Sequence, residues 1–440
     1  MGLDSEYSPV TGRVVAVSRS PGPTMSERNE SSIRLRAGLG VAGDRRRAGA
    51  TTSPVLPGGV QAVAASSIVS PEDQRVTFVE LFFDLVFVFS VTQVVSLFHG
   101  HLTWEIAARA LLAFWLVWWA WTQFTWALNA ADTTHHRVAM ATLLATAVAF
   151  VMAVALPRAF DGEAHWFAVP YVLVRLIGLV LYTRVAAADA EQRNAVRLFF
   201  TVSLGGLAAV LLGAFSGQSL YLFWGLAIVL DVVAAAVGGQ AEGWNLHAEH
   251  FGERHGLFVI IALGETLIVA ATGVSRSEWT ASMISGGLLT VAATCALWWS
   301  YFMRAKPVLD RALDRARGNA RSTMARDVFS LIHFPMICGI IAYAAGVEEA
   351  AAHPGDVLSW EGRIALAAGV VLFVGGMAAA MWRADRRVLG ARAALSLAAA
   401  GAVLFTPGLL PQFALGIVLV AVAAVAVLES RALPPAGEAP

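Results

Sequence analysis

Apolar runs of membrane-spanning length follow one another almost without a pause from Val76 onward. A helix needs about 20 mostly apolar residues to cross a bilayer, and in lipid each spanning segment must satisfy its own backbone polar groups. The runs therefore predict an all-α membrane protein. Twelve transmembrane helices are expected, at 76–98, 104–128, 138–157, 166–187, 195–215, 219–238, 256–275, 281–303, 326–346, 362–382, 392–407 and 411–429.

The composition agrees with lipid as the solvent. The chain is 57% hydrophobic and 14% charged, whereas an ordinary soluble domain is about 25% charged. The formal net charge is zero, so no overall field favours nucleic acid as a partner. The expected partners are the lipid bilayer and a small ion or solute, and the sequence leaves the oligomeric state open.

Both ends of the chain differ from this apolar region. Residues 1–70 are rich in Ser, Arg, Gly and Pro and contain no apolar run long enough for a signal peptide. Such a segment cannot bury a core, so it is expected to be a disordered cytoplasmic tail. Residues 431–440 are expected to form a short cytoplasmic tail.

The basic residues predict the orientation, because cytoplasmic loops carry the excess of Lys and Arg. With the N-terminus inside, the tails and inner loops hold 26 of the 31 Lys and Arg residues. The outer loops hold only Arg158, Arg276 and Arg363. We therefore expect a multi-pass protein of the bacterial inner membrane with both termini in the cytoplasm.

A weak internal repeat divides the spans into six plus six, over 76–238 and 256–430. Trp118-Trp119 and Trp298-Trp299 occupy corresponding places in the second and eighth spans, and Arg-rich inner loops follow the fourth and tenth. Six spans is an even number, so the two units would have like orientation. Chance similarity between apolar sequences is the alternative.

Ionisable side chains within spans indicate possible functional residues, because each costs about 2.5–3.5 kcal/mol on insertion scales. Glu80 and Asp84 are four residues apart in the first span and share one face. They belong either to a transport pathway or to a structural salt bridge with Arg109 or Arg175, the two basic residues placed within other spans.

Glu265 lies near the middle of the seventh span, with no opposite charge elsewhere in that span. Functional use is favoured over a structural role, and Glu265 is the expected protonatable centre. One helical stripe carries Arg254, Phe258, Ile261, Glu265 and Thr272, and this face is expected to look into the bundle.

Other polar residues have a plainer interpretation. Asp231 and His333 lie deep in the sixth and ninth spans, where hydrogen-bonded packing is more common than ligand binding. The inner loops expected at 129–137 and 239–255 contain Asp132, His247 and His250, which could bind a metal or be solvated. No nucleotide-binding motif occurs, so no cofactor is expected.

Two stretches resemble the signatures of the bacterial low temperature requirement A family. The first is VELFFDLVFVF at 79–89, and the second is EHFGER at 249–254 running into IIALGE at 260–265. The resemblance covers residues 75 to about 430. It implies a polytopic bacterial membrane protein and draws attention to Glu80, Asp84, Glu253, Arg254 and Glu265. The family has no settled substrate or reaction, so the resemblance implies neither.

The resulting hypothesis is a secondary transporter of a small ion or solute, for which proton coupling is one option, with Glu265 as its protonatable residue. One alternative is a cation channel lined by the first helix of each six-helix unit. A second alternative is a membrane-bound metalloenzyme that uses the histidines of the inner loops. An enzyme is the less favoured class, because no catalytic motif occurs.

Overall fold

The computed structural model describes residues 68–71, 74–99, 102–238, 244, 246–276, 279–386 and 390–432. The tail expected at 1–70 lies outside these residues, apart from its last three positions. The tail expected at 431–440 also lies outside them, apart from its first two. The described residues are almost entirely helical, with one isolated β-bridge between Val69 and Ala131.

The first group of helices corresponds to the first six expected spans. It comprises α1 (Phe78–Ser96), α2 (Trp104–Ala130), α3 (His136–Ala155), η1 (Leu156–Arg158), α4 (Ala164–Val185), η2 (Ala186–Ala188), α5 (Ala190–Phe215), η3 (Gly217–Ser219) and α6 (Leu220–Gly238). The three η segments are single 3₁₀ turns at helix ends.

The second group contains two long helices that change pitch. It comprises α7 (Ala248–Arg276), α8 (Ala281–Trp299), η4 (Ser300–Ala305), α9 (Lys306–Arg315), α10 (Gly318–Met324), η5 (Ala325–Ile332), α11 (His333–Ala352), α12 (Trp360–Asp385), α13 (Gly390–Phe405) and α14 (Pro411–Ala432). The η4 and η5 segments are π-helices, which are rare and often occur at functional sites.

Side-chain caps fix several of the helix starts. The hydroxyls of Thr103, Thr280 and Ser359 accept backbone hydrogen bonds at the starts of α2, α8 and α12. Asp189 does the same with two backbone N–H groups of α5. Each cap satisfies donors that the first turn of a helix leaves without an internal partner. Their positions explain why the observed boundaries lie close to those expected from hydropathy.

Ten helices of the described residues are long and apolar enough to cross a membrane. Large apolar side chains cover the outer faces, including Leu144 (58% exposed), Leu222 (72%) and Val420 (68%). A soluble protein rarely exposes so much contiguous apolar surface, and lipid removes the penalty. The chain is therefore a polytopic helical membrane protein.

Two of the twelve expected spans, α2 and α13, do not meet that standard of length and hydropathy. The α2 helix is about 40 Å long at 1.5 Å per residue, but it contains Gln123, Asn129 and several Thr and Trp residues that are buried against protein. A helix surrounded by protein need not be apolar. The α13 helix has 16 residues, or about 24 Å.

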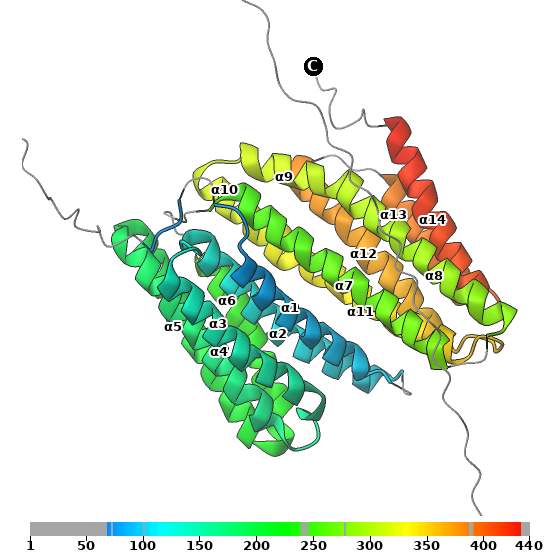
Figure 1. Cartoon of the computed structure of the whole chain (residues 1–440), viewed down its shortest axis with the longest axis horizontal. Coiled ribbons are helices and arrows are strands. Elements are labelled where there is room, and N and C mark those ends of the chain that lie inside the picture. The colour runs from blue at the N-terminus through cyan, green and yellow to red at the C-terminus, as the bar shows by residue number, and fades with distance from the viewer. Residues whose placement is uncertain are drawn as a thin grey trace, which may run out of the picture. The chain divides into compact units, whose positions relative to one another are not determined.

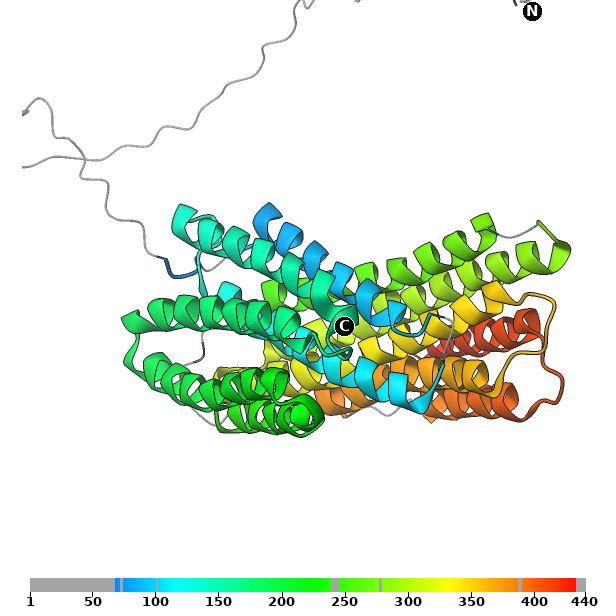
Figure 2. The same ribbon diagram turned by 90° about the horizontal axis from the view of Figure 1, so that it is seen from below.

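The helices pack as two groups that meet along α1 and α2 (Figure 1). In the first group α1 packs on α3, α3 on α4, α4 on α5, and α5 on α6. In the second group α7 packs on α11, α11 on α12, α12 on α13, and α13 on α14. The α1 and α2 helices both contact α7 and α11, and the long helices run in the same general direction in both views (Figure 2).

One expected boundary is wrong. The seventh span begins at Ala248 rather than at 256, so Glu249, His250, Glu253 and His255 lie on a helix instead of in a loop. This first part of α7 is more polar than the rest of the helix. It is helical because its polar residues find partners on α1 and α2, where His250 and His255 are both buried.

Candidate functional site

The two stretches that resemble family signatures meet at the α1–α7 contact. Asp84 of α1 accepts hydrogen bonds from Nη2 of Arg254 and, at 3.4 Å, from Nε of the same guanidinium. The indole Nε1 of Trp121 on α2 donates to the same carboxylate at 2.7 Å. All three side chains are buried. Three helices thus hold one Asp84 carboxylate in a fully enclosed position.

Glu80 lies one turn before Asp84 and has two kinds of partner. Its Oε2 accepts hydrogen bonds from the backbone N and the hydroxyl of Thr77, both at 2.9 Å, which caps α1. Its Oε1 lies 2.9 Å from Nε2 of His250 and 3.8 Å from Nη1 of Arg254. Glu80 is 0% exposed, so these contacts are its only compensation among the described residues.

The ring of His250 is oriented by Asn129 at the end of α2. The Asn129 amide Nδ2 lies 3.0 Å from Nδ1 of His250 and also donates to the backbone carbonyl of His247 at 3.0 Å. If Asn129 donates to Nδ1, the proton of a neutral imidazole is on Nε2 and faces Glu80. His250 therefore presents an N–H to a buried carboxylate.

The charges of this cluster, which we define as Glu80, Asp84, His250 and Arg254, do not cancel with a neutral imidazole. Two ionised carboxylates and one guanidinium leave one negative charge in a buried place. An uncompensated buried charge is costly.

Further along both helices, Glu265 of α7 meets Thr92 of α1. The hydroxyl of Thr92 donates to Oε2 of Glu265 at 2.7 Å, and Glu265 is 4% exposed. No Arg or Lys pairs with it in the described part of the chain. Because Asp84 meets Arg254 and Thr92 meets Glu265 in the same order, α1 and α7 run parallel.

The stripe expected on α7 is only partly correct. Arg254, Phe258 and Glu265 are buried, but Thr272 is exposed and its hydroxyl donates to the carbonyl of Ile268 in its own helix. Thr272 therefore lies off the inward-facing surface of α7, which continues past Glu265 to the buried Ala270. Beyond the end of α1, Nε2 of His99 lies 3.1 Å from Oε1 of Glu348 on α11.

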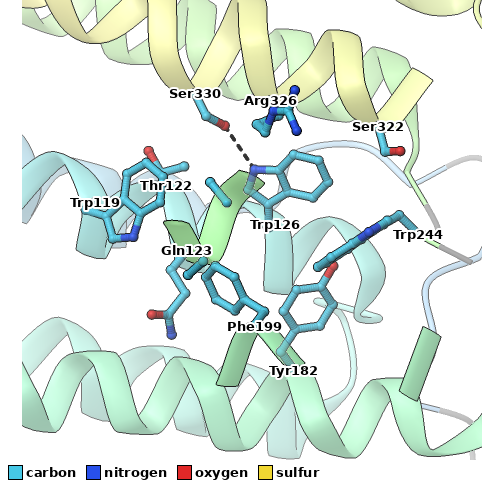
Figure 3. Close-up of a pocket in the computed structure, with 12 residues that line it drawn as sticks. Trp119, Thr122, Gln123, Trp126, Tyr182, Phe199, Trp244, Ser322, Arg326 and Ser330 are labelled. Atoms are coloured by element: carbon cyan, nitrogen blue, oxygen red, sulfur yellow. Dashed lines mark hydrogen bonds between the residues drawn. The ribbon is translucent and has the colours of Figure 1, made fainter. Parts of the chain in front are cut away.

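The other face of α2 lines a cavity between the two groups of helices. From the first group, Trp119, Thr122, Gln123 and Trp126 of α2 line it together with residues of α4, α5 and α6 (Figure 3). From the second group, Ser322, Arg326 and Ser330 line it. The indole of Trp126 donates to the hydroxyl of Ser330 at 3.0 Å.

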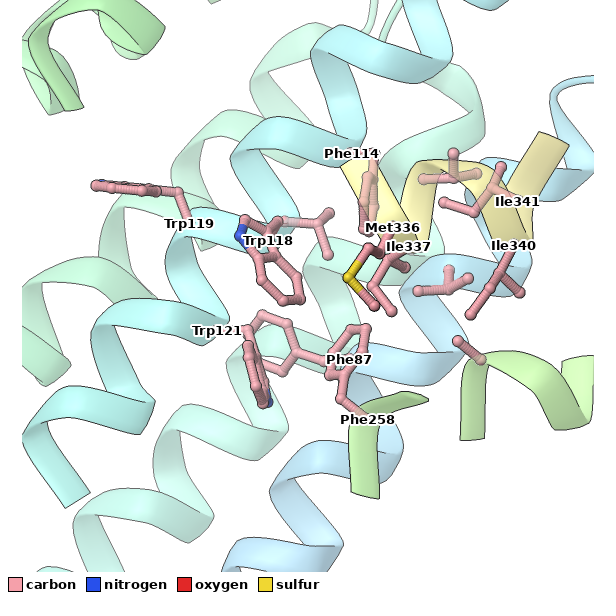
Figure 4. Packing of buried hydrophobic residues seen from close by; sticks show 14 of the residues in the cluster. Phe87, Phe114, Trp118, Trp119, Trp121, Phe258, Met336, Ile337, Ile340 and Ile341 are labelled. Carbon is pink, nitrogen blue, oxygen red and sulfur yellow. The ribbon is translucent and has the colours of Figure 1, made fainter. Parts of the chain in front are cut away.

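Apolar and aromatic packing closes the space between the buried charge cluster and Glu265. Phe87 of α1 and Phe258 of α7 are both 0% exposed, and they lie beside Trp121 in the core (Figure 4). The rings of Trp121 and Phe258 have centroids 4.5 Å apart. The carboxylates at the two ends of the contact are therefore separated by a layer of apolar and aromatic side chains.

The basic partners expected for Asp84 are wrong. Arg109 pairs with Glu105 in an exposed part of α2. Arg175 of α4 pairs with Asp231 of α6 at 3.1 Å, and both side chains are buried. Asp231 is thus an ion-pair residue rather than an isolated polar one. His333 agrees with the packing interpretation, because its ring lies 2.8 Å from both the Tyr301 hydroxyl and the Val328 carbonyl.

The residues proposed for a metal are not brought together as a group. His250 contacts Glu80 and Asn129, while Asp132 accepts hydrogen bonds from Thr134 in a turn. His247 exchanges backbone hydrogen bonds with Asn129. Among the described residues no three His, Cys, Asp or Glu side chains could hold a metal ion together.

Glu253 is exposed on α7, away from its buried neighbour Arg254. Three contacts were not anticipated: Thr92, Trp121 and Asn129. Thr92 follows Asp84 by eight residues on the same face of α1, so a four-residue period would have indicated it. Trp121 and Asn129 are two of several polar side chains on α2, and their spacing carries no signal.

Comparisons with known proteins find similarity over the part of the chain that contains this region. The family described as "Bacterial low temperature requirement A protein (LtrA)" matches residues 75–428. An uncharacterized protein of Rhizobium meliloti (strain 1021) is 30% identical over 341 residues, which cover 72% of this chain and 80% of that protein. No solved structure matches the chain.

Proposed function

Because the chain belongs to the bacterial low temperature requirement A family and is a polytopic helical membrane protein, we propose that it is a proton-coupled secondary transporter of a small ion or solute. The observation that carries this proposal is the line of protonatable groups between α1 and α7. It runs from the cluster of Glu80, Asp84, His250 and Arg254, across a layer of apolar and aromatic side chains, to Glu265.

The position of this line suits alternating access. It lies where the two groups of helices meet, so a relative movement of the groups would open the layer formed by Phe87 and Phe258. Glu265 has no Arg or Lys partner among the described residues, so it can take up a proton when water reaches it. The buried cluster can do the same from its own end of the contact.

The packing order supports two repeats of like orientation. The contacts α1–α2, α1–α3, α3–α4, α4–α5, α5–α6 and α2–α6 have counterparts in α7–α8, α7–α11, α11–α12, α12–α13, α13–α14 and α8–α14. The first helices of the two groups run parallel, as units of six spans require. This arrangement needs α2 and α13 to span as well, which gives twelve spans.

The proposed orientation rests on the distribution of Lys and Arg. It places the start of α1 and α7 at the cytoplasmic face of the inner membrane, together with both termini. The channel and metalloenzyme alternatives have less support. Phe87 and Phe258 interrupt any path along α1, and the inner histidines have protein partners.

Uptake into proteoliposomes with and without an imposed pH gradient tests the proposal. The probes are Na⁺, K⁺ and small organic anions such as benzoate. At least one probe should accumulate with the wild-type protein only when the gradient is present. Glu265→Gln should remain folded and lose this accumulation, whereas Glu191→Gln, a change at an exposed carboxylate on α5, should retain it. Equal accumulation with and without a gradient for every probe would reject proton coupling.

A further inference from the structure

The cavity on the far side of α2 is lined by side chains of the kinds found in small-molecule binding sites. The cavity has a volume of about 50 Å³, more than the 10–15 Å³ or so that a single water molecule needs. Residues of α2, α4, α5 and α6 line one side, and residues of α10 and η5 line the other. The cavity therefore lies between the two groups of helices, separate from the α1–α7 contact.

Aromatic rings form most of its lining. The Trp244 ring has its centroid 5.4 Å from that of Trp126 and 5.6 Å from that of Tyr182. Trp119 and Phe199 also line the cavity, together with Ala234 and Ala235. Rings arranged in this way present flat faces and edges, which suit a planar apolar ligand.

Two hydroxyl groups in this wall have no partner among the described residues. They are Oγ1 of Thr122 and the phenolic oxygen of Tyr182. Thr122 is 3% exposed and Tyr182 is 1% exposed, and Figure 3 shows the Tyr182 hydroxyl pointing toward the space beside Trp126 and Trp244. Buried hydroxyls are normally hydrogen-bonded, so both groups are available to a ligand or to water.

The charge at the cavity wall is positive. Arg326 lines the cavity and binds Asp327 through Nε and Nη2. Asp327 is shared with Arg383, whose Nη2 lies 2.8 Å from the second carboxylate oxygen. Among the described residues, the Asp327 carboxylate therefore faces two guanidinium groups, of which that of Arg326 lines the cavity. The charge of Arg326 disfavours a cationic ligand and favours an anionic one.

We propose that this cavity binds a small planar organic anion, such as an aromatic ring that carries a carboxylate. The ring would lie against Trp126, Tyr182 and Trp244. The carboxylate would accept hydrogen bonds from the two hydroxyls. It would also be attracted by the positive charge of Arg326. The inference goes beyond the proposed transport function, because binding in the cavity does not depend on whether the protein moves the ligand across the membrane.

The test is equilibrium binding to the purified full-length protein in detergent, followed by quenching of tryptophan fluorescence and by calorimetry. The probes are benzoate, benzyl alcohol and benzylamine, which share a ring and differ in charge. Benzoate should bind saturably and at least tenfold more tightly than the other two. Arg326→Gln should weaken benzoate binding tenfold or more, and Thr122→Val should weaken it severalfold.

The matched controls separate the site from the fold. Arg311→Gln removes an exposed guanidinium on α9 and should leave benzoate binding unchanged. Ala235→Leu fills the cavity without removing a charge, so it should abolish binding even if the Arg326 variant does not fold. Absence of saturable benzoate binding, or tighter binding of benzylamine, would overturn the proposal. Undiminished binding in Ala235→Leu would overturn it as well.

Discussion

Arg254 is fully buried and holds Asp84 with two nitrogen atoms, while its guanidinium also lies 5.8 Å from the centre of the Trp121 ring. Removing one partner of a buried ion pair leaves the other charge without compensation. The guanidinium also faces Glu80. A single residue of α7 therefore fixes two carboxylates of α1.

Arg254→Gln is expected to destabilise the protein by about 3–5 kcal/mol, the usual cost of breaking a buried pair. Thermal unfolding in detergent, followed by tryptophan fluorescence, measures the change. Arg158→Gln, at a side chain that is 74% exposed, should have no measurable effect.

The double variant Arg254→Gln with Asp84→Asn separates pairing from packing. It removes both charges of the bidentate pair, so its unfolding midpoint should lie closer to wild type than that of Arg254→Gln alone. A double variant that is less stable than the single one would contradict the ion-pair account.

The sequence drew attention to three carboxylates within spans but did not identify the side chains that they contact. Glu80, Asp84 and Glu265 were recognisable because carboxylates within spans are costly. The partners of these carboxylates were not recognisable in the same way. The candidate basic residues lay within expected spans, whereas Arg254 lies just before the expected seventh span. The polar stretch Glu249–His255 lowers hydropathy, yet the fold buries its inward side.

At the scale of helices, α2 is held by hydrogen bonds to the π-helix η5. The indole of Trp118 donates to the backbone carbonyl of Ser330 at 2.8 Å, and that of Trp126 donates to the Ser330 hydroxyl. The neighbouring π-helix η4 has a similar contact, since Arg392 of α13 donates to the carbonyl of Ser300 at 3.2 Å. Side chains from other helices thus reach both π-helices.

Trp118→Phe is expected to cost about 1–3 kcal/mol, because it leaves the buried Ser330 carbonyl without this donor. The same unfolding assay measures it. Trp298→Phe is the matched control, since Trp298 is 38% exposed and should change the midpoint little. Equal effects of the two variants would show that the Trp118 hydrogen bond contributes nothing to stability.

The helix positions were largely predictable, and the early start of α7 has a physical cause. Apolar runs locate helices because lipid-facing surfaces must be apolar, as on α3 and α6. Hydropathy fails for the start of α7, where polar residues contact protein instead of lipid. It also underestimates α2, which is buried on most of its surface. The pitch changes at η4 and η5 leave no pattern in hydropathy.

At the scale of the whole molecule, the orientation follows from the division of basic residues between loops. Reporter fusions after residues 190 and 315 are expected to read cytoplasmic, and fusions within 159–163 and 353–357 are expected to read external. The short loop after α11 is the decisive position, because its reading depends on the number of spans before it. A cytoplasmic reading at 353–357 would contradict the proposed twelve spans.

The N-terminal segment is expected to be dispensable up to the point where it contacts the bundle. Ser70 donates its backbone N–H to Ala130, and the Gln74 side chain donates to Leu128 at 3.1 Å. Deleting residues 1–65 should leave the unfolding midpoint unchanged, whereas deleting 1–74 should lower it because α2 loses these contacts. A marked loss of folded protein on deleting 1–65 would show that the earlier segment also docks.

The central claim is that protons move through the α1–α7 contact with Glu265 as an obligatory carrier. Glu265→Gln resembles the protonated side chain in shape and charge, so the bundle should keep its fold, but a glutamine cannot release a proton. Loss of proton movement without loss of fold would therefore separate a functional role from a structural one. Glu191→Gln, outside this contact, is the control.

The most direct measurement is the internal pH of proteoliposomes, reported by trapped pyranine after Na⁺, K⁺ or benzoate is added outside. The account predicts that at least one probe changes the internal pH with the wild-type protein and with Glu191→Gln, and that Glu265→Gln gives no change while exchange of the same probe persists. The contrary result is a pH change with Glu265→Gln equal to that of wild type, which would show that protons do not pass through Glu265.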